Sequence, residues 1–374
     1  MEGTRRLQEA RPTSLLGKRA RPSCGGGGGG GGGGALHQTP RHHPDREGLP
    51  PALAAVEPRS HCPARVGEYL LVAPLDVGGY RAVHEATGKE FICKVVEAAR
   101  WPTLLEAYRR VCPHELVSSP VELLVGSRHT YALHAHAHSD AHALVRARGR
   151  LPEPEAARLF RHMAEAVARC HERGLVLRDL KLRRFVFRDP ERTQLVLDGL
   201  EDALLLQGMD DSLTDRRACP AYVSPELLRS SPSASAGAPR PVPYSGRAAD
   251  VWGLGVALYA MLVGRYPFHD PAPSALFRKI RHGRYALPEW LSPAARCLIG
   301  GLLRHEPSER ATAWDALQHP WLRVGDTGSA TATATNSRTM PVNPSVNAGC
   351  VWSRNDDQTV PDVEVEEAGD LFFS

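Results

Sequence analysis

Two patterns of apolar residues divide the central part of the chain. Between residues 69 and 96, Val, Tyr, Phe and Ile recur in short runs separated by glycine turns, which predicts a small antiparallel sheet. Residues 248–263 are nearly all apolar, which is typical of a helix buried on all sides. Another helix is predicted from residue 152 onward, because apolar residues recur there every three or four positions. Those positions are Ala156, Leu159, Phe160, Met163, Val167 and Cys170.

A strand-rich part followed by a helix-rich part predicts an α+β fold with two lobes and a cleft between them. The two ends of the chain lack such patterns. Residues 1–64 contain ten consecutive glycines, and residues 324–374 begin with Thr, Ala, Asn and Ser and end in an acidic stretch. Segments with so little apolar surface cannot offset the entropy of ordering. We therefore expect one folded domain at residues 65–323 between two disordered tails.

Charge is distributed unevenly over these three zones. Basic and acidic residues number 9 and 5 in residues 1–64 (+4), 35 and 29 in residues 65–323 (+6), and 2 and 8 in residues 324–374 (−6), which sum to the net +4 of the chain. The N-terminal zone contains a short basic cluster, Lys18, Arg19 and Arg21. This cluster has two interpretations, a nuclear-import signal or solvated charges in a flexible arm. So small an excess neutralises few phosphates, so direct nucleic-acid binding is not expected.

The remaining composition narrows the class of protein. No run of 18 apolar residues occurs, so a transmembrane helix is not expected. The eight cysteines include no C-x-x-C pair, which argues against a zinc site and against a disulfide-built fold. We therefore expect a reducing compartment, the nucleus or the cytoplasm.

Several short motifs occur in the order in which protein kinases carry them. They are FICK at 91–94, LRDLK at 177–181, CPAYVSPE at 219–226 and DVWGLGV at 250–256. These resemble the strand with the phosphate-contacting lysine, the catalytic loop, the end of the activation segment and the start of the central helix. Glu226 and Arg310 stand where kinases place a buried ion pair, and Asp250 opens the central-helix motif. The resemblance implies a bilobal protein-kinase-like fold in which these three residues are structural.

Departures from the kinase pattern fall on the metal site. Phosphoryl transfer needs Mg²⁺, which kinases hold with a loop Asn and with the Asp of D-F-G. Arg184 stands at the Asn position, and the D-F-G position aligns with residues 199–201 (GLE), which puts Glu201 in that motif and leaves no Asp in register. The alternative alignment, with the Phe deleted, keeps Asp198 as a residual ligand. Only Gly78 and Gly79 remain of the phosphate-covering glycine loop.

Three residues of the kinase machinery survive: Lys94, Asp179 and Lys181. They have two interpretations, a feeble kinase with its base in place or a hydrogen-bonding scaffold in the cleft, and the second is favoured because a base without metal is of little use. The acidic partner of Lys94 is not evident. Candidates are Glu97, Glu106 and Glu115. We expect ATP binding to be weak or absent, and metal-independent if present, so no cofactor is predicted.

The altered metal positions together with the C-terminal tail resemble one family, the Tribbles pseudokinases. The resemblance covers residues 65–323 and 356–374. It implies an adaptor whose tail docks on the WD40 propeller of an E3 ubiquitin ligase. The matching tail residues are Asp357, Gln358, Val360 and Pro361. An extended Val-Pro pair suits an apolar pocket, and proline lowers the cost of ordering the tail.

The Tribbles resemblance also implies further partners. They are MAP kinase kinases, Akt kinases and C/EBP-type transcription factors, and the family's MAP kinase kinase site falls at the end of the larger lobe. Its residues here are Leu317, His319, Pro320, Trp321 and Leu322. Because many kinase domains end in His-Pro-Trp for packing alone, both interpretations stay open. Localisation in the nucleus and cytoplasm is expected.

One feature fits neither resemblance. His134, His136 and His138 alternate with alanines, which would place three imidazoles on one face of a strand, with His142 nearby. Alternating histidines can bind Zn²⁺ or Cu²⁺, but Asp140 is the one other residue at ligand spacing, so no metal is predicted. The leading hypothesis is therefore an adaptor that damps kinase signalling and promotes degradation of bound proteins. The alternative is a weakly active serine/threonine kinase.

Overall fold

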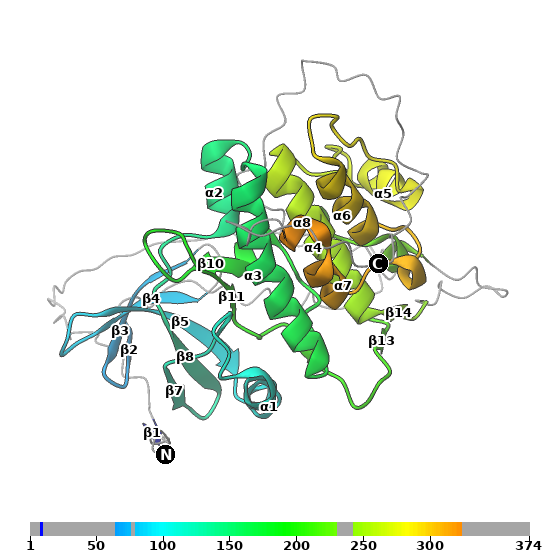
Figure 1. Cartoon of the computed structure of the whole chain (residues 1–374). Coiled ribbons are helices and arrows are strands. Elements are labelled where there is room, and N and C mark those ends of the chain that lie inside the picture. Colours follow the sequence, from blue (N-terminus) through cyan, green and yellow to red (C-terminus); the bar gives the residue numbers. More distant parts are fainter. Residues whose placement is uncertain (1–7, 10–63, 76–78, 230–241, 324–374) are drawn as a thin grey trace, which may run out of the picture.

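The computed structural model describes residues 8–9, 64–75, 79–229 and 242–323. Within these ranges the α+β, two-lobed prediction is confirmed, and Figure 1 shows a sheet-based lobe beside a larger helical one. The nuclear-import candidate and the ligase-binding tail residues lie outside the described ranges. The structure therefore bears on the central zone of the chain.

The smaller lobe is a sheet with strand order β1-β7-β8-β5-β4-β3-β2, antiparallel except where β1 pairs with β7. Phe91, Cys93 and Leu133 point into its core, and β5 pairs with β8 so that Lys94 and His134 share the opposite face. The elements are β1 (Gln8–Glu9), β2 (Ala64–Val66), β3 (Tyr69–Pro74), β4 (Tyr80–His84), β5 (Glu90–Glu97), α1 (Trp101–Val111), β7 (Glu122–Val125) and β8 (His129–Ala135).

Helices dominate the larger lobe. They are α2 (Ala141–Arg148), α3 (Glu153–Glu172), α4 (Gly246–Val263), α5 (Pro273–His282), α6 (Pro293–Leu302), α7 (Ala313–Gln318) and α8 (Pro320–Arg323). The six apolar positions predicted for the helix that starts near residue 152 are all buried on α3. Helix α4 has the length and hydropathy of a membrane-spanning helix, but 78% of it is buried, as the sequence predicts for a core helix.

Short strands and single helical turns connect the helices. The strands are β6 (Val117–Ser118), β9 (Leu175–Val176), β10 (Phe185–Phe187), β11 (Leu195–Asp198), β12 (Leu204–Leu205), β13 (Ser212–Leu213) and β14 (Tyr244–Ser245). The 3₁₀ turns are η1 (Leu182–Arg184), η2 (Pro225–Leu228) and η3 (Pro307–Glu309). Strands β10, β11 and β6 form one sheet, which brings the end of β11 to the smaller lobe.

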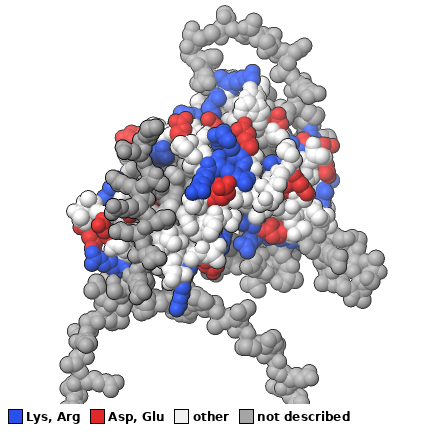
Figure 2. All heavy atoms as spheres, turned by 90° about the horizontal axis from the view of Figure 1, so that it is seen from below, with Lys and Arg blue, Asp and Glu red and all other residues white. Residues whose placement is uncertain are grey.

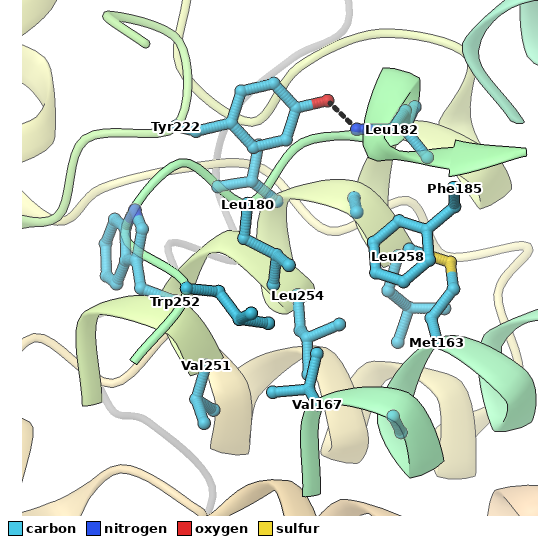
Figure 3. Close-up of a cluster of buried hydrophobic side chains, with 14 of the residues drawn as sticks. Met163, Val167, Leu180, Leu182, Phe185, Tyr222, Val251, Trp252, Leu254 and Leu258 are labelled. Atoms are coloured by element: carbon cyan, nitrogen blue, oxygen red, sulfur yellow. Dashed lines mark hydrogen bonds between the residues drawn. The ribbon is translucent and has the colours of Figure 1, made fainter. Parts of the chain in front are cut away.

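The loop between β9 and η1 rests on the packed centre of the larger lobe (Figure 3). Leu180 of this loop and Leu182, the first residue of η1, point into a cluster that includes Met163 of α3 and Leu254 of α4, all buried. The hydroxyl of Tyr222 accepts the backbone N–H of Leu182 at 3.3 Å. Burial of these apolar side chains therefore holds the loop that carries the kinase-like residues in place.

A buried ion pair ties the 219–226 motif to the end of the lobe. Arg310 donates to Glu226 at 2.6 Å and 3.0 Å, and the two side chains are 0% and 4% exposed. The guanidinium also donates to the Ala248 carbonyl at 2.7 Å and lies 5.1 Å from the ring centre of Trp252. Glu226 and Arg310 thus form the buried ion pair expected from the sequence, and the structure shows that its geometry is bidentate.

Candidate functional site

One buried carboxylate holds the loop after β9. Asp250 is 1% exposed and accepts the backbone N–H groups of Leu177 at 2.7 Å and Arg178 at 2.8 Å. These bonds position the part of the loop that carries Asp179, whose carboxylate lies 3.0 Å from the ammonium of Lys181. The two surviving residues of this loop therefore neutralise each other.

Lys94 reaches two carboxylates from the segment after β11. Its ammonium lies 3.0 Å from Asp198 Oδ2 and 3.4 Å from Glu201 Oε2, and it donates to the Asp198 carbonyl at 3.3 Å. The three side chains are 16%, 23% and 18% exposed, so solvent screens these contacts weakly. The lysine that contacts phosphate in kinases is thus engaged by carboxylates of its own chain.

None of the three glutamates proposed as the partner of Lys94 has that role. Glu97 and Glu115 are exposed, and Glu106 on α1 pairs instead with Arg110 on the same helix at 3.1 Å. The partner is not evident from the sequence because the carboxylates that Lys94 contacts lie 104 and 107 residues further along the chain, beyond the catalytic loop. Motif spacing alone does not show such a substitution.

Glu201 is held from the side of the smaller lobe. Its Oε1 accepts the hydroxyl hydrogen of Tyr108 at 3.1 Å and lies 3.7 Å from His134 Nε2. The Tyr108 oxygen also accepts the backbone N–H of Leu200 at 3.2 Å, and Leu200 is fully buried. Sequence reasoning missed Tyr108, because its place on α1 gives no sign of contact with residues 200–201.

Asp198, the residual ligand of the alternative alignment, lies beside Lys94 of the smaller lobe. Burial alone would raise the pKa of its carboxyl, but Lys94, His134 and Arg184 lower it below its ordinary value, so it is ionised. Its Oδ2 is nevertheless the atom that contacts Lys94. An aspartate is therefore present, but as the partner of an ammonium group.

Gly199 stands where the favoured alignment with D-F-G would place the aspartate. Its φ is +79°, and a Cβ built there would lie 2.6 Å from Lys94 Nζ and even closer to the Glu201 carboxylate. Any side chain at this position would therefore meet the contact between Lys94 and Glu201. An aspartate at position 199 would therefore have to displace the ends of the Lys94 and Glu201 side chains from their contact.

Arg184, at the position that the sequence aligns with the metal-binding Asn of kinases, makes two contacts with the segment after β11. Nη1 lies 2.9 Å from Asp202 Oδ2, and Nη2 donates to the Gly199 carbonyl at 3.1 Å. Burial alone would lower the pKa of the guanidinium, but surrounding carboxylates raise it above its ordinary value. They are Glu201, Asp202, Asp179 and Asp198. The acidic groups around this position are thus balanced by guanidinium and ammonium groups.

The histidine series does not lie on one face of a strand. Strand β8 ends at Ala135, so His134 lies within it and is 1% exposed, whereas His136 and His138 follow it and are exposed. Burial, then the charge of Lys94, lowers the pKa of His134 to about 4. Within the described ranges, no three or more metal-ligating side chains gather in one place.

Most of the side chains proposed to bind MAP kinase kinases are buried. His319, Trp321 and Leu322 are 6%, 5% and 1% exposed, and the Trp321 indole donates to Glu153 Oε2 at 2.9 Å. Leu317 is half-buried and Pro320 is exposed. The packing interpretation therefore accounts for the three buried residues.

Comparisons with known proteins agree with this geometry. The family described as "Protein kinase domain" matches residues 78–322. Tribbles homolog 3 of Bos taurus is 55% identical over 275 residues, which cover 73% of this chain and 74% of that protein. This chain belongs to the Tribbles family. Tribbles homolog 3 of Homo sapiens is 52% identical over 74% of this chain and 76% of its own length, and Tribbles homolog 2 of Mus musculus is 47% identical over 84% of each. The family resemblance inferred from the sequence is thereby confirmed.

Proposed function

We propose that this member of the Tribbles family is a pseudokinase that works as an adaptor. The observation that carries this proposal is Arg184, whose guanidinium bonds to Asp202 and to the Gly199 carbonyl among four carboxylates. A resident cation at the metal position disfavours Mg²⁺ by charge repulsion, and phosphoryl transfer depends on that metal to neutralise the transition state. We therefore assign the chain no cofactor and no phosphoryl-transfer activity.

The proposed binding functions rest on the resemblance of this chain to the Tribbles family. The tail residues Asp357, Gln358, Val360 and Pro361 would recruit an E3 ubiquitin ligase with a WD40 propeller. The domain would hold Akt kinases, MAP kinase kinases or C/EBP-type transcription factors, so that cascades are damped and bound proteins degraded, in the nucleus and the cytoplasm. On the face shown in Figure 2, basic and acidic side chains are interspersed, which suits protein partners better than a phosphate backbone.

The proposed MAP kinase kinase contact shifts to the exposed side of α7. Trp314 is 56% exposed and stands three residues before Leu317, so the two share one face of the helix. Pro320, which is exposed, begins α8 two residues after α7 ends. A Trp314→Ala variant of the full chain should lose MAP kinase kinase binding, whereas Trp290→Ala, at a tryptophan that is 54% exposed, should keep it.

A weakly active serine/threonine kinase is the second candidate, because Lys94, Asp179 and Asp198 are all present in the cleft region. Two variants of the full chain separate the candidates. An adaptor should retain ligase-dependent ubiquitination of a bound partner after Asp179→Asn and lose it after Val360→Ala combined with Pro361→Ala. Loss of function with Asp179→Asn, and none with the tail change, would favour the kinase.

A further inference from the structure

Arg178 directs its guanidinium at the segment that follows the cleft. Its backbone has a left-handed φ of +65°, and the Asp250 carboxylate, which accepts its N–H at 2.8 Å, supports this conformation. Asp250 is itself contacted by His171 Nε2 at 2.8 Å. The direction in which the Arg178 side chain leaves the loop is therefore set by buried hydrogen bonds.

The Arg178 guanidinium joins two distant points of one segment. Nε donates to the Asp202 carbonyl at 2.7 Å, and Nη1 donates to Asp215 Oδ2 at 2.5 Å. The arginine side chain is 12% exposed and the aspartate 37%. Since a charged donor and a charged acceptor make the strongest hydrogen bonds, this pair can hold the middle of the segment against the loop.

Asp215 is also held from the opposite side. The Tyr244 hydroxyl donates to the Asp215 carbonyl at 2.6 Å. Strand β13, which ends two residues before Asp215, pairs with β14, which begins at Tyr244. Asp211, at the start of this stretch, accepts the Ser245 hydroxyl at 2.7 Å and the Arg247 N–H at 3.0 Å. The carboxylate is thus presented to Arg178 by a fixed backbone.

In kinases that are switched by phosphorylation, a phosphate on the activation segment orders it by pairing with arginine. We propose that Asp215 takes the place of such a phosphate on Arg178, so that this segment is ordered in the unmodified chain. The ligand class of the Arg178 pocket is then a phosphomonoester, for which a carboxylate of the chain substitutes. The inference concerns order in the segment and stands whether or not the chain is an adaptor.

Limited trypsin digestion of the full chain tests this directly, because Arg216 and Arg217 follow Asp215. Asp215→Asn should speed cleavage after these arginines about tenfold, the effect expected when one charge-assisted hydrogen bond is lost from a local opening equilibrium. Asp210→Asn is the matched control, since Asp210 bonds to the Ser212 N–H and to no arginine among the described residues. It should leave the cleavage rate unchanged.

Replacement of Asp215 by serine or by genetically encoded phosphoserine gives the second arm. The serine protein should be cleaved as fast as Asp215→Asn, and the phosphoserine protein should regain the protection of the natural chain. Equal cleavage of the natural chain and Asp215→Asn would overturn the proposal. So would equal cleavage of the serine and phosphoserine proteins, because the pocket would then not accept a phosphate.

Discussion

Replacing Arg184 by asparagine, the residue that kinases carry there, should destabilise the domain rather than repair it. The change removes the 2.9 Å contact to Asp202 and the 3.1 Å bond to the Gly199 carbonyl, and it leaves Asp198 and Glu201 with Lys94 as their remaining nearby cation. Removing one partner of a buried ion pair costs about 3–5 kcal/mol. Asp202 is 43% exposed, so solvent screens this pair and the loss should be nearer 2 kcal/mol.

The lost bond to the carbonyl adds about 0.5–1 kcal/mol, so the free energy of unfolding should fall by about 2–3 kcal/mol. For a domain of this size that corresponds to a Tm lower by about 5–10 °C. Thermal unfolding of the full chain measures it, with Arg188→Asn, at an exposed arginine, as the control. Mg²⁺ should partly restore the Tm of Arg184→Asn, because the carboxylates have lost a counter-charge. An unchanged Tm with no effect of Mg²⁺ would refute the reasoning.

Three further predictions concern the same network and its supports. Gly199→Asp should lower the free energy of unfolding by about 2 kcal/mol in urea titrations, because residue 199 has a left-handed φ of +79° and its side chain would displace the Glu201 carboxylate. Adding Glu201→Gly should recover part of the loss, and equal stability of the single and double variants would contradict this. The imidazole of His134 has a folded pKa of about 4, below its unfolded value near 6.5, so stability should fall as the pH drops from about 6.5 toward 4, at about 1.4 kcal/mol per unit. His134→Phe should reduce the slope of the unfolding free energy against pH in this range by the contribution of one proton. An unchanged slope would show that other groups cause it. Arg310→Met should cost at least about 3 kcal/mol, since it leaves the Glu226 carboxylate buried without its partner, and a loss below 1 kcal/mol would show that water reaches Glu226.

The parts of the fold that the sequence predicted are those governed by local periodicity. Met163 and Val167 fall on the buried face of α3 because apolar burial every three or four residues is what makes that helix stable. The buried pair of Glu226 and Arg310 was also predicted, since ordered kinase motifs place both residues.

The cleft could be predicted only in part, because its contacts join residues far apart in the chain. Arg184 was identified from its motif position, but Asp198 and Glu201 as partners of Lys94 depend on how β11 meets the smaller lobe. Periodicity predicted three histidines on one face, but the strand ends at Ala135, so His136 and His138 lie beyond it. Spacing fixes where a side chain points only while the element continues.

The central claim is that cations of the chain itself, Arg184 and Lys94, take the place of a metal in this cleft. The most direct test is the thermal stability of the full chain with ATP, in the presence of Mg²⁺ and in the presence of a chelator, beside an Asp198→Ala variant. We predict no Tm shift with ATP, or a small one that is the same with Mg²⁺ and with the chelator. A large Mg²⁺-dependent shift that Asp198→Ala abolishes would contradict the account, because Asp198 would then bind a metal.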